Sequence, residues 1–277
     1  MEHIYEPYLM RIAAITQETS DTKTFRLAFA DPADHEGFTF EPGQFGLFSV
    51  FGHGEATFGL ANSPTRNGYI ECSVKRVGRV TGALHQMNVG DIVGFRGPYG
   101  RGFPVEELRG RDLLFAGGGI GMAPLRSLLR TCLDRRDEFG AITVVYGARS
   151  VADLVYKPEL REWAARDDMR TILTVDPGGE DESWTGEVGF VPAVLEKANP
   201  SPENTEVITC GPPIMIRFVI ETLSRLGFAP EQIITTLEAK MKCGLGKCGR
   251  CNIGPAYVCK HGPVFRFSEL QTLPAEY

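Results

Sequence analysis

The sequence lacks the features that mark several large classes of protein. No apolar run approaches the roughly 18 residues that a membrane-spanning helix needs, and the N-terminus has no basic start followed by an apolar stretch, as a secretory signal would. Basic residues are too few for nonspecific nucleic-acid binding, because 29 Lys and Arg stand against 35 Asp and Glu, a net charge of −6. We therefore expect a cytoplasmic protein with no membrane span and no nucleic-acid partner.

Histidine is also scarce, and it forms no catalytic pattern. The five histidines match neither a catalytic triad nor a metal-binding spacing: His3, His35, His53, His85 and His261. We interpret each as a surface or structural residue, and we expect the chemistry of this protein to reside in bound cofactors.

The 277 residues, 43% of them hydrophobic, suffice for two folded modules and a shorter segment. Residues 1–105 alternate with period two between turn residues, which predicts a small β-barrel with a short helix at 81–87. Its predicted strands are 8–17, 22–29, 44–51, 69–77 and 91–96.

Residues 106–235 alternate strands with helices, which predicts a parallel sheet with helices on both faces. The predicted strands are 112–116, 141–146, 170–175 and 206–209. The predicted helices are 123–135, 157–165, 191–197 and 214–226. Residues 236–277 form a third, cysteine-rich segment.

A glycine run follows the first strand of the α/β region and opens its first helix: Gly117-Gly118-Gly119-Ile120-Gly121-Met122-Ala123-Pro124. Backbone without Cβ atoms lets a pyrophosphate approach the N–H groups of a helix N-terminus. Pro124 stands where the Rossmann fingerprint has its third glycine, and proline is compatible with the first turn of a helix. The run predicts a nucleotide site, with a tight strand-to-helix turn as the alternative.

Two further strand ends of the same sheet point to the same ligand. The second strand ends in Gly147-Ala148-Arg149, where a Rossmann NAD site would have an acidic residue. Arg149 is a candidate for binding the 2′-phosphate of NADPH, with a surface arginine as the alternative. The turn Cys210-Gly211-Pro212 ends another strand, which would place Cys210 near the reacting end of a dinucleotide. A buried, inert cysteine is the alternative.

A second anion site is predicted in the barrel. The strand containing Ser73-Val74-Lys75 is followed by Gly78-Arg79-Val80-Thr81, a glycine and a threonine at the start of a short helix. Two such sites in one chain predict two nucleotides, whereas a simple helix cap is the alternative.

Four of the seven cysteines lie close together near the C-terminus: Cys243, Cys248, Cys251 and Cys259. The first three follow the C-x4-C-x2-C spacing of [2Fe–2S] ferredoxins. Four cysteines can also hold zinc, although structural zinc usually shows two C-x2-C pairs and only one is present. In a cytosolic chain such clustering favours a metal site over disulfides. We favour an iron–sulfur cluster.

Together these residues resemble the ferredoxin–NADP reductase superfamily over nearly the whole chain. The stretch 241–251, MKCGLGKCGRC, with Tyr257-Val258-Cys259, resembles one iron–sulfur branch of it. That branch contains the electron-transfer subunit of dihydroorotate dehydrogenase, the gamma subunit of cytosolic nickel–iron hydrogenases and the flavin subunit of anaerobic sulfite reductase. The resemblance implies an FAD-binding β-barrel, an NAD(P)-binding domain and a [2Fe–2S] segment.

The resemblance also assigns residues to cofactors. The Arg-x-Tyr-Ser flavin signature of the family falls on Ala56-Thr57-Phe58-Gly59, so its arginine, tyrosine and serine are all replaced, and Leu60 follows. Ser73-Val74-Lys75, with Gly78, Val80 and Thr81, match the family's FAD-binding strand and helix start. By the same comparison Gly118–Pro124 hold the pyrophosphate of NAD(P)H, and Cys210-Gly211-Pro212 border its nicotinamide.

The function implied is electron transfer between NAD(P)H, FAD, a [2Fe–2S] cluster and the catalytic and iron–sulfur subunits of a larger complex. A hydrogenase, a sulfite reductase or a heterodisulfide-reductase-like enzyme would fit as the complex. Two alternatives stay open: a self-contained flavin reductase whose tail binds structural zinc, and a degenerate assembly subunit that has lost its flavin.

Overall fold

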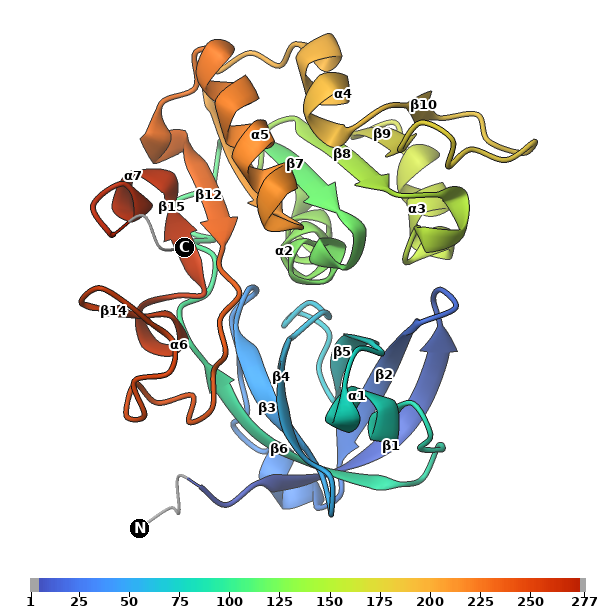
Figure 1. Ribbon diagram of the computed structural model, residues 1–277, viewed down its shortest axis with the longest axis vertical. Helices are drawn as coiled ribbons and strands as arrows, with labels where there is room; N and C mark the ends of the chain where they lie inside the picture. The colour runs from blue at the N-terminus through green and yellow to red at the C-terminus, as the bar shows by residue number, and fades with distance from the viewer. Residues whose placement is uncertain (1–4, 275–277) are drawn as a thin grey trace.

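The computed structural model describes residues 5–274, which form two stacked domains with a C-terminal segment along one side of both (Figure 1). The β domain lies at the bottom of Figure 1 and the α/β domain at the top. The predicted architecture of β domain, parallel α/β domain and cysteine-rich segment is confirmed.

The β domain is one six-stranded antiparallel sheet in the order β4-β3-β6-β1-β2-β5, curled around an apolar core. Alternate residues such as Met10, Ile12, Phe25, Phe48 and Phe95 point inward and are fully buried, as period two requires. The strands are β1 (Tyr8–Gln17), β2 (Thr22–Phe29), β3 (Phe45–Val50), β4 (Gly54–Gly59), β5 (Ile70–Lys75) and β6 (Ile92–Tyr99), with helix α1 (Arg79–Leu84) and the short turn η1 (Pro32–His35).

Strand β4 was not predicted, and α1 begins two residues before the predicted helix. The sequence of β4, GEATFG, shows no alternation of apolar and polar residues. The strand lies at the edge of the sheet and pairs only with β3. Its assignment therefore depends on that pairing.

The α/β domain is built on a seven-stranded sheet in the order β10-β9-β8-β7-β11-β12-β15. Its strands are β7 (Asp112–Gly118), β8 (Ile142–Ala148), β9 (Arg170–Val175), β10 (Glu187–Val188), β11 (Thr205–Cys210) and β12 (Ile233–Thr236), all parallel. The helices are α2 (Met122–Asp134), α3 (Lys157–Ala164), α4 (Val191–Ala198) and α5 (Pro213–Arg225), with 3-10 turns η2 (Gly119–Gly121), η3 (Arg136–Glu138), η4 (Val151–Asp153) and η5 (Pro230–Gln232).

The C-terminal segment contributes to the α/β sheet as well as carrying the cysteines. Strand β15 (Val264–Arg266) pairs antiparallel with β12, so the sheet continues beyond residue 235, where we placed the boundary. The rest of the segment contains β13 (Asn252–Ile253), β14 (Ala256–Tyr257), α6 (Val258–His261) and α7 (Phe267–Leu270). Within residues 5–274 no helix is long and apolar enough to cross a membrane.

Candidate functional site: a dinucleotide cavity beside a cysteine loop

A cavity of about 780 Å³ opens where the carboxyl ends of the parallel strands face the β domain (Figure 1). Strands β7 and β8 end at its wall, at Gly118 and Ala148, and Gly211, the residue after β11, also lines it. The β domain adds Thr22 and Lys75. Ligands of open parallel sheets bind at such carboxyl ends. The volume is that of a small-molecule pocket, and its place between the domains suits a dinucleotide.

The glycine run contributes to this wall at positions where a side chain would not fit. A Cβ atom on Gly121 would lie 2.6 Å from the backbone of Gly211, and one on Gly118 would lie 2.3 Å from the sulfur of Met215. The loop after β7 and the turn after β11 can therefore approach each other only because these positions lack side chains. This close approach leaves bare backbone facing the cavity, as pyrophosphate binding requires.

The structure brings most of the predicted nucleotide-binding residues to the cavity wall: Gly118, Gly119, Ile120, Gly121, Gly147, Ala148, Arg149, Gly211 and Pro212. It does not bring Met122, Ala123 or Pro124 there. Met122 and Ala123 are buried in the hydrophobic core beneath the first turn of α2, and Pro124 belongs to that turn. Their part in the motif is to start the helix.

The charged residues of the cavity wall are largely paired with one another. Arg149 lies 3.3 Å from Asp153, and Lys75 lies 3.3 Å from Asp21. Asp176, which follows β9, also lines the cavity, and burial raises its pKa. Sequence reasoning missed Asp176, although its place at the carboxyl end of a parallel strand was a usable signal.

Cys210 lies at the end of β11, buried with 6% of its surface exposed. The hydroxyl of Thr236 donates a hydrogen bond to its sulfur at 2.9 Å. Burial raises the pKa of Cys210 to about 12, so it is a protonated thiol at neutral pH. Glu238, two residues after β12, lines the cavity and was not predicted.

The flavin-binding residues predicted in the β domain occupy different environments. Thr57, Phe58 and Gly59 lie half-buried on the edge strand β4, whereas Leu60 and Val74 are buried in the core. The remaining predicted residues lie on β5 and around α1. Ser73 lies on β5 and Lys75 ends it, Gly78 directly precedes α1, and Val80 and Thr81 lie within α1.

Thr81 makes the start of α1 compact. Its hydroxyl accepts hydrogen bonds from the N–H groups of Val77 at 3.0 Å and Gly78 at 2.8 Å. Ser73 is instead hydrogen-bonded to Thr24 at 2.7 Å and to the hydroxyl of Tyr156, which belongs to the α/β domain. The predicted FAD strand is thus tied directly to the nucleotide domain.

A largely buried ion-pair network also joins the two domains, and its members do not line the cavity. Arg126 of α2 lies 2.7 Å from Glu71 of β5 and 2.8 Å from Glu159 of α3, and Arg26 lies 2.9 Å from Glu71. Burial opposes ionisation of Glu71 and by itself would raise its pKa. The charge and hydrogen bond of Arg126, with the hydrogen bond of Arg26, outweigh burial, so the pKa of Glu71 is lowered. No local pattern revealed this network, because its members are far apart in the sequence.

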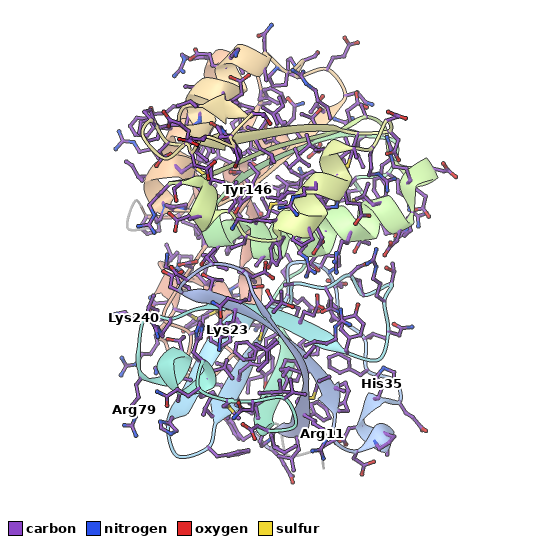
Figure 2. All side chains as sticks on the ribbon, turned by 90° about the vertical axis from the view of Figure 1, so that its right-hand side faces the viewer. Arg11, Lys23, His35, Arg79, Tyr146 and Lys240 are labelled. Carbon is purple, nitrogen blue, oxygen red and sulfur yellow. The ribbon has the colours of Figure 1, made fainter. Side chains whose placement is uncertain are left out.

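Tyr146 takes part in a second connection between the glycine run and the β domain. It lies in the upper domain of Figure 2, and its hydroxyl donates to the carbonyl of Gly119 at 3.1 Å and accepts from the N–H of Val155 at 3.1 Å. Val155 precedes Tyr156, which contacts Ser73 in the β domain. Three hydrogen bonds and the peptide bond between Val155 and Tyr156 therefore link the predicted pyrophosphate loop to the predicted FAD strand.

Three of the four clustered cysteines, Cys243, Cys248 and Cys251, lie on a loop packed against the side of the β domain, and Cys259 lies on the short helix α6 that follows. A Cβ on Gly244, whose φ is +73°, would meet the ring of Tyr99 at 2.5 Å, and the hydroxyl of Thr57 donates to the carbonyl of Met241 at 3.4 Å. Lys240, just before this loop, lies at the level of the β domain in Figure 2. The loop is thus seated on the strands β4 and β6.

Backbone N–H groups of this loop point at the cysteine sulfurs. Leu245 and Lys247 donate to Cys243 at 3.4 and 3.3 Å, and Gly246 donates to Cys259 at 3.1 Å. Burial opposes ionisation of Cys243, but these backbone donors outweigh it and lower its pKa to about 6. Donors arranged in this way stabilise the thiolates that ligate iron–sulfur clusters.

The four sulfurs differ in exposure. Cys251 and Cys259 are buried, Cys243 is half-buried and Cys248 is exposed. Burial and a hydrogen bond with Cys251 raise the pKa of Cys259 to about 12. In the described part of the chain no group of three or more His, Cys, Asp or Glu side chains is arranged to hold a single metal ion. Four thiols are the donor set that a [2Fe–2S] cluster takes, and Cys248 is the most exposed of them.

Each of the three parts of the chain matches a known protein family. Residues 9–103 match the oxidoreductase FAD-binding domain, and residues 115–221 match the oxidoreductase NAD-binding domain. Residues 238–271 match the iron–sulfur cluster binding domain of dihydroorotate dehydrogenase B. The predicted cofactors, FAD, NAD(P) and an iron–sulfur cluster held by the C-terminal cysteines, are confirmed.

Similar proteins span almost the full chain. The sulfhydrogenase 1 subunit gamma of Pyrococcus furiosus is 39% identical over 274 residues, covering 98% of this chain and 94% of that protein. A probable dihydroorotate dehydrogenase B electron transfer subunit of Methanocaldococcus jannaschii is 33% identical over 262 residues, and the match covers 94% of this chain and 90% of that protein.

Solved structures share the fold. A NADH-dependent reduced ferredoxin-NADP oxidoreductase superposes with a TM-score of 0.76 at 24% identity, covering 96% of this chain and 89% of that chain. The Amycolatopsis cytochrome P450 reductase GcoB superposes with a TM-score of 0.69 at 27% identity, and the match covers 82% of this chain and 68% of that chain.

Proposed function

Because the chain belongs to the ferredoxin–NADP reductase-like FAD- and NAD-binding oxidoreductases, in the branch with the iron–sulfur domain of dihydroorotate dehydrogenase B, we propose that it is the electron-transfer subunit of a multisubunit enzyme. In this role it exchanges electrons between NAD(P)H and a partner catalytic subunit. Similarity to a sulfhydrogenase subunit gamma over 98% of the chain favours a hydrogenase-type partner over a sulfite reductase or heterodisulfide-reductase-like one.

The observation that carries this proposal is the short path from the dinucleotide cavity to the cysteine loop. Glu238 lines the cavity, and Cys243 follows only five residues later in the same segment. Between them, Met241 accepts a hydrogen bond from Thr57 of β4, the strand on which the flavin signature of the family falls. The nucleotide, flavin and cluster sites are therefore adjacent.

The residues of this chain serve to hold and orient the cofactors. When bound, FAD exchanges two electrons with NAD(P)H as a hydride, and a [2Fe–2S] cluster carries single electrons. The glycine run and the turn after Cys210 would bind the dinucleotide, and the Arg126–Glu71 network keeps the two domains in one relative position. The N–H donors of residues 245–247 would stabilise the cluster thiolates.

An optical spectrum of anaerobically purified protein tests the proposal. We expect flavin bands on a broad iron–sulfur background, and we expect NADH or NADPH to bleach both. Cys248→Ser should lose most of the iron–sulfur absorbance while nucleotide still bleaches the flavin. Cys132→Ala, which removes a buried thiol outside the loop, should keep both signals.

Two results would contradict the proposal. A colourless protein, purified under conditions that preserve clusters, would point to a degenerate assembly subunit. Zinc in place of iron on metal analysis, with flavin still reduced by nucleotide, would point to a self-contained flavin reductase.

A further inference from the structure

The cysteine loop carries positive charge in an unusual arrangement. From Ala239 to Ser268 the sequence has no Asp or Glu, and each of the four clustered cysteines has a cation as its immediate neighbour. These neighbours, here called the basic rim, are Lys242, Lys247, Arg250 and Lys260.

The basic rim is exposed and its charges are unpaired. All four side chains are exposed, and within residues 5–274 none of them lies within ion-pair distance of a carboxylate. At the C-terminal end of the same segment the pattern is different, because Arg266 pairs with Glu206 and Glu269 pairs with Arg101 of the β domain. The rim charges are thus available to something outside this chain.

Holding the sulfurs does not account for the rim. The hydrogen bonds to Cys243 and Cys259 come from backbone N–H groups, not from lysine or arginine side chains. Lys260 runs along the outside of the loop over Gly246, and the ammonium of Lys247 lies 5.6 Å from the ring centroid of Tyr5. The most exposed cysteine, Cys248, lies in sequence between Lys247 and Arg250.

We propose that the basic rim and the exposed edge at Cys248 form the docking surface for an acidic patch on a partner protein. The inference rests on the proposed electron-transfer function and adds the charge and the place of the contact. Without the four rim cations the chain would carry −10, so the rim is a cluster of positive charge on a chain that is otherwise net negative. Such a distribution of charge selects one docking orientation, over the cluster.

Binding of a protein probe tests the proposal. The probe is a small, strongly acidic [2Fe–2S] ferredoxin, titrated calorimetrically into the holoprotein at 20 and 200 mM salt. We expect the Kd to rise about tenfold with salt, because opposite charges on the two surfaces are screened. Lys247→Glu combined with Arg250→Glu should raise the Kd at low salt by about tenfold or more, and should strengthen binding of the basic protein cytochrome c.

A matched variant separates docking from the change in net charge. Arg161 and Arg170 are exposed cations of the α/β domain that form no ion pair among the described residues, and α3, which carries Arg161, lies on the opposite side of the molecule from α6 (Figure 1). Arg161→Glu combined with Arg170→Glu should leave the Kd within about twofold of the wild type. If the first pair of substitutions displaces the cluster, Lys242→Glu combined with Lys260→Glu replaces it.

Three outcomes would overturn the docking surface: no binding of the acidic probe at 20 mM salt, equal weakening by the control pair, or equally tight binding of a double-stranded DNA oligonucleotide. Bleaching by NAD(P)H, recorded in the same samples, keeps the two proposals apart. Normal bleaching without charge-dependent binding would overturn the docking surface alone. Charge-dependent binding without bleaching would overturn the electron-transfer function and leave the surface.

Discussion

At the scale of single residues, the dinucleotide cavity depends on positions where a side chain would not fit. Gly121 is the clearest of them, because an added Cβ would lie 2.6 Å from backbone atoms of Cys210 and Gly211 that cannot move aside as a side chain would. The loop after β7 and the turn after β11 would have to separate, which changes the shape of the wall.

We therefore expect Gly121→Ala to weaken binding of NAD(P)H. Overpacking of this kind costs about 1–3 kcal/mol, which corresponds to a roughly five- to 150-fold higher Kd. Flavin content should stay unchanged, because Gly121 lies in the α/β domain. Nucleotide titration followed by flavin absorbance measures both quantities.

Gly82→Ala serves as the matched control. An added Cβ there meets no atom within 4 Å, so the Kd should not change. Equal effects of the two substitutions would show that the close approach of the two loops has no role in binding.

At the scale of secondary-structure elements, the contact between β5 and α2 holds the domains together. Glu71, 3% exposed, contacts Arg126, 4% exposed, and the network continues to Glu159 on α3. A nearby pair, Arg66 with Asp134, also joins the domains, at 2.9 Å, but its side chains are 44% and 25% exposed. The two contacts differ mainly in burial.

Glu71→Gln should lower the free energy of unfolding at pH 7 by about 3 kcal/mol, because it leaves a buried arginine short of a negative partner. The folded pKa of Glu71 is lowered, so its contribution is present above the unfolded carboxyl pKa of about 4.3 and is lost as the pH falls through the folded pKa. The difference between variant and wild type should shrink on acidification below about pH 4. Denaturant unfolding at several pH values measures it.

Asp134→Asn is the control for this prediction, since exposed pairs contribute at most about 1 kcal/mol. If Asp134→Asn lowered the free energy of unfolding as much as Glu71→Gln does, burial would not set the strength of these interdomain contacts.

At the scale of the whole molecule, Arg101 fastens the C-terminal segment to the two domains. It follows β6, donates to the carbonyl of Val264 at 2.9 Å and pairs with Glu269 at 2.7 Å. The cysteine loop lies between this attachment and strand β12, so its position depends on both ends.

Arg101→Ala should therefore loosen the cluster before the flavin. We expect a chelator to remove the iron–sulfur absorbance roughly tenfold faster, the effect of about one lost charge-assisted hydrogen bond, while flavin absorbance stays constant. Arg109→Ala, which breaks exposed pairs with Glu106 and Glu138, should not change the rate. Simultaneous loss of flavin and cluster would show that Arg101 supports the whole fold and not the segment.

The sequence was sufficient for those features that short stretches of chain encode. Period-two alternation located five of the six strands of the β domain, and the glycine run and the cysteine spacing each marked a site. It was insufficient for β4, an edge strand without alternation, and for β15, three residues whose strand character comes from pairing with β12. The burial of Met122 and Ala123 also depended on the packing of α2.

By itself, then, the sequence determined the order of the domains, the kind of cofactor each binds and the charge of the cysteine loop, because these follow from residues that are neighbours in the chain. Only the tertiary structure decided which distant residues meet: Glu71 with Arg126, Cys210 with Thr236, and Glu238 with the dinucleotide cavity. It also decided that the rim cations stay unpaired while Arg101 and Arg266 do not. Burial and pairing depend on contacts across the fold, and no local pattern records them.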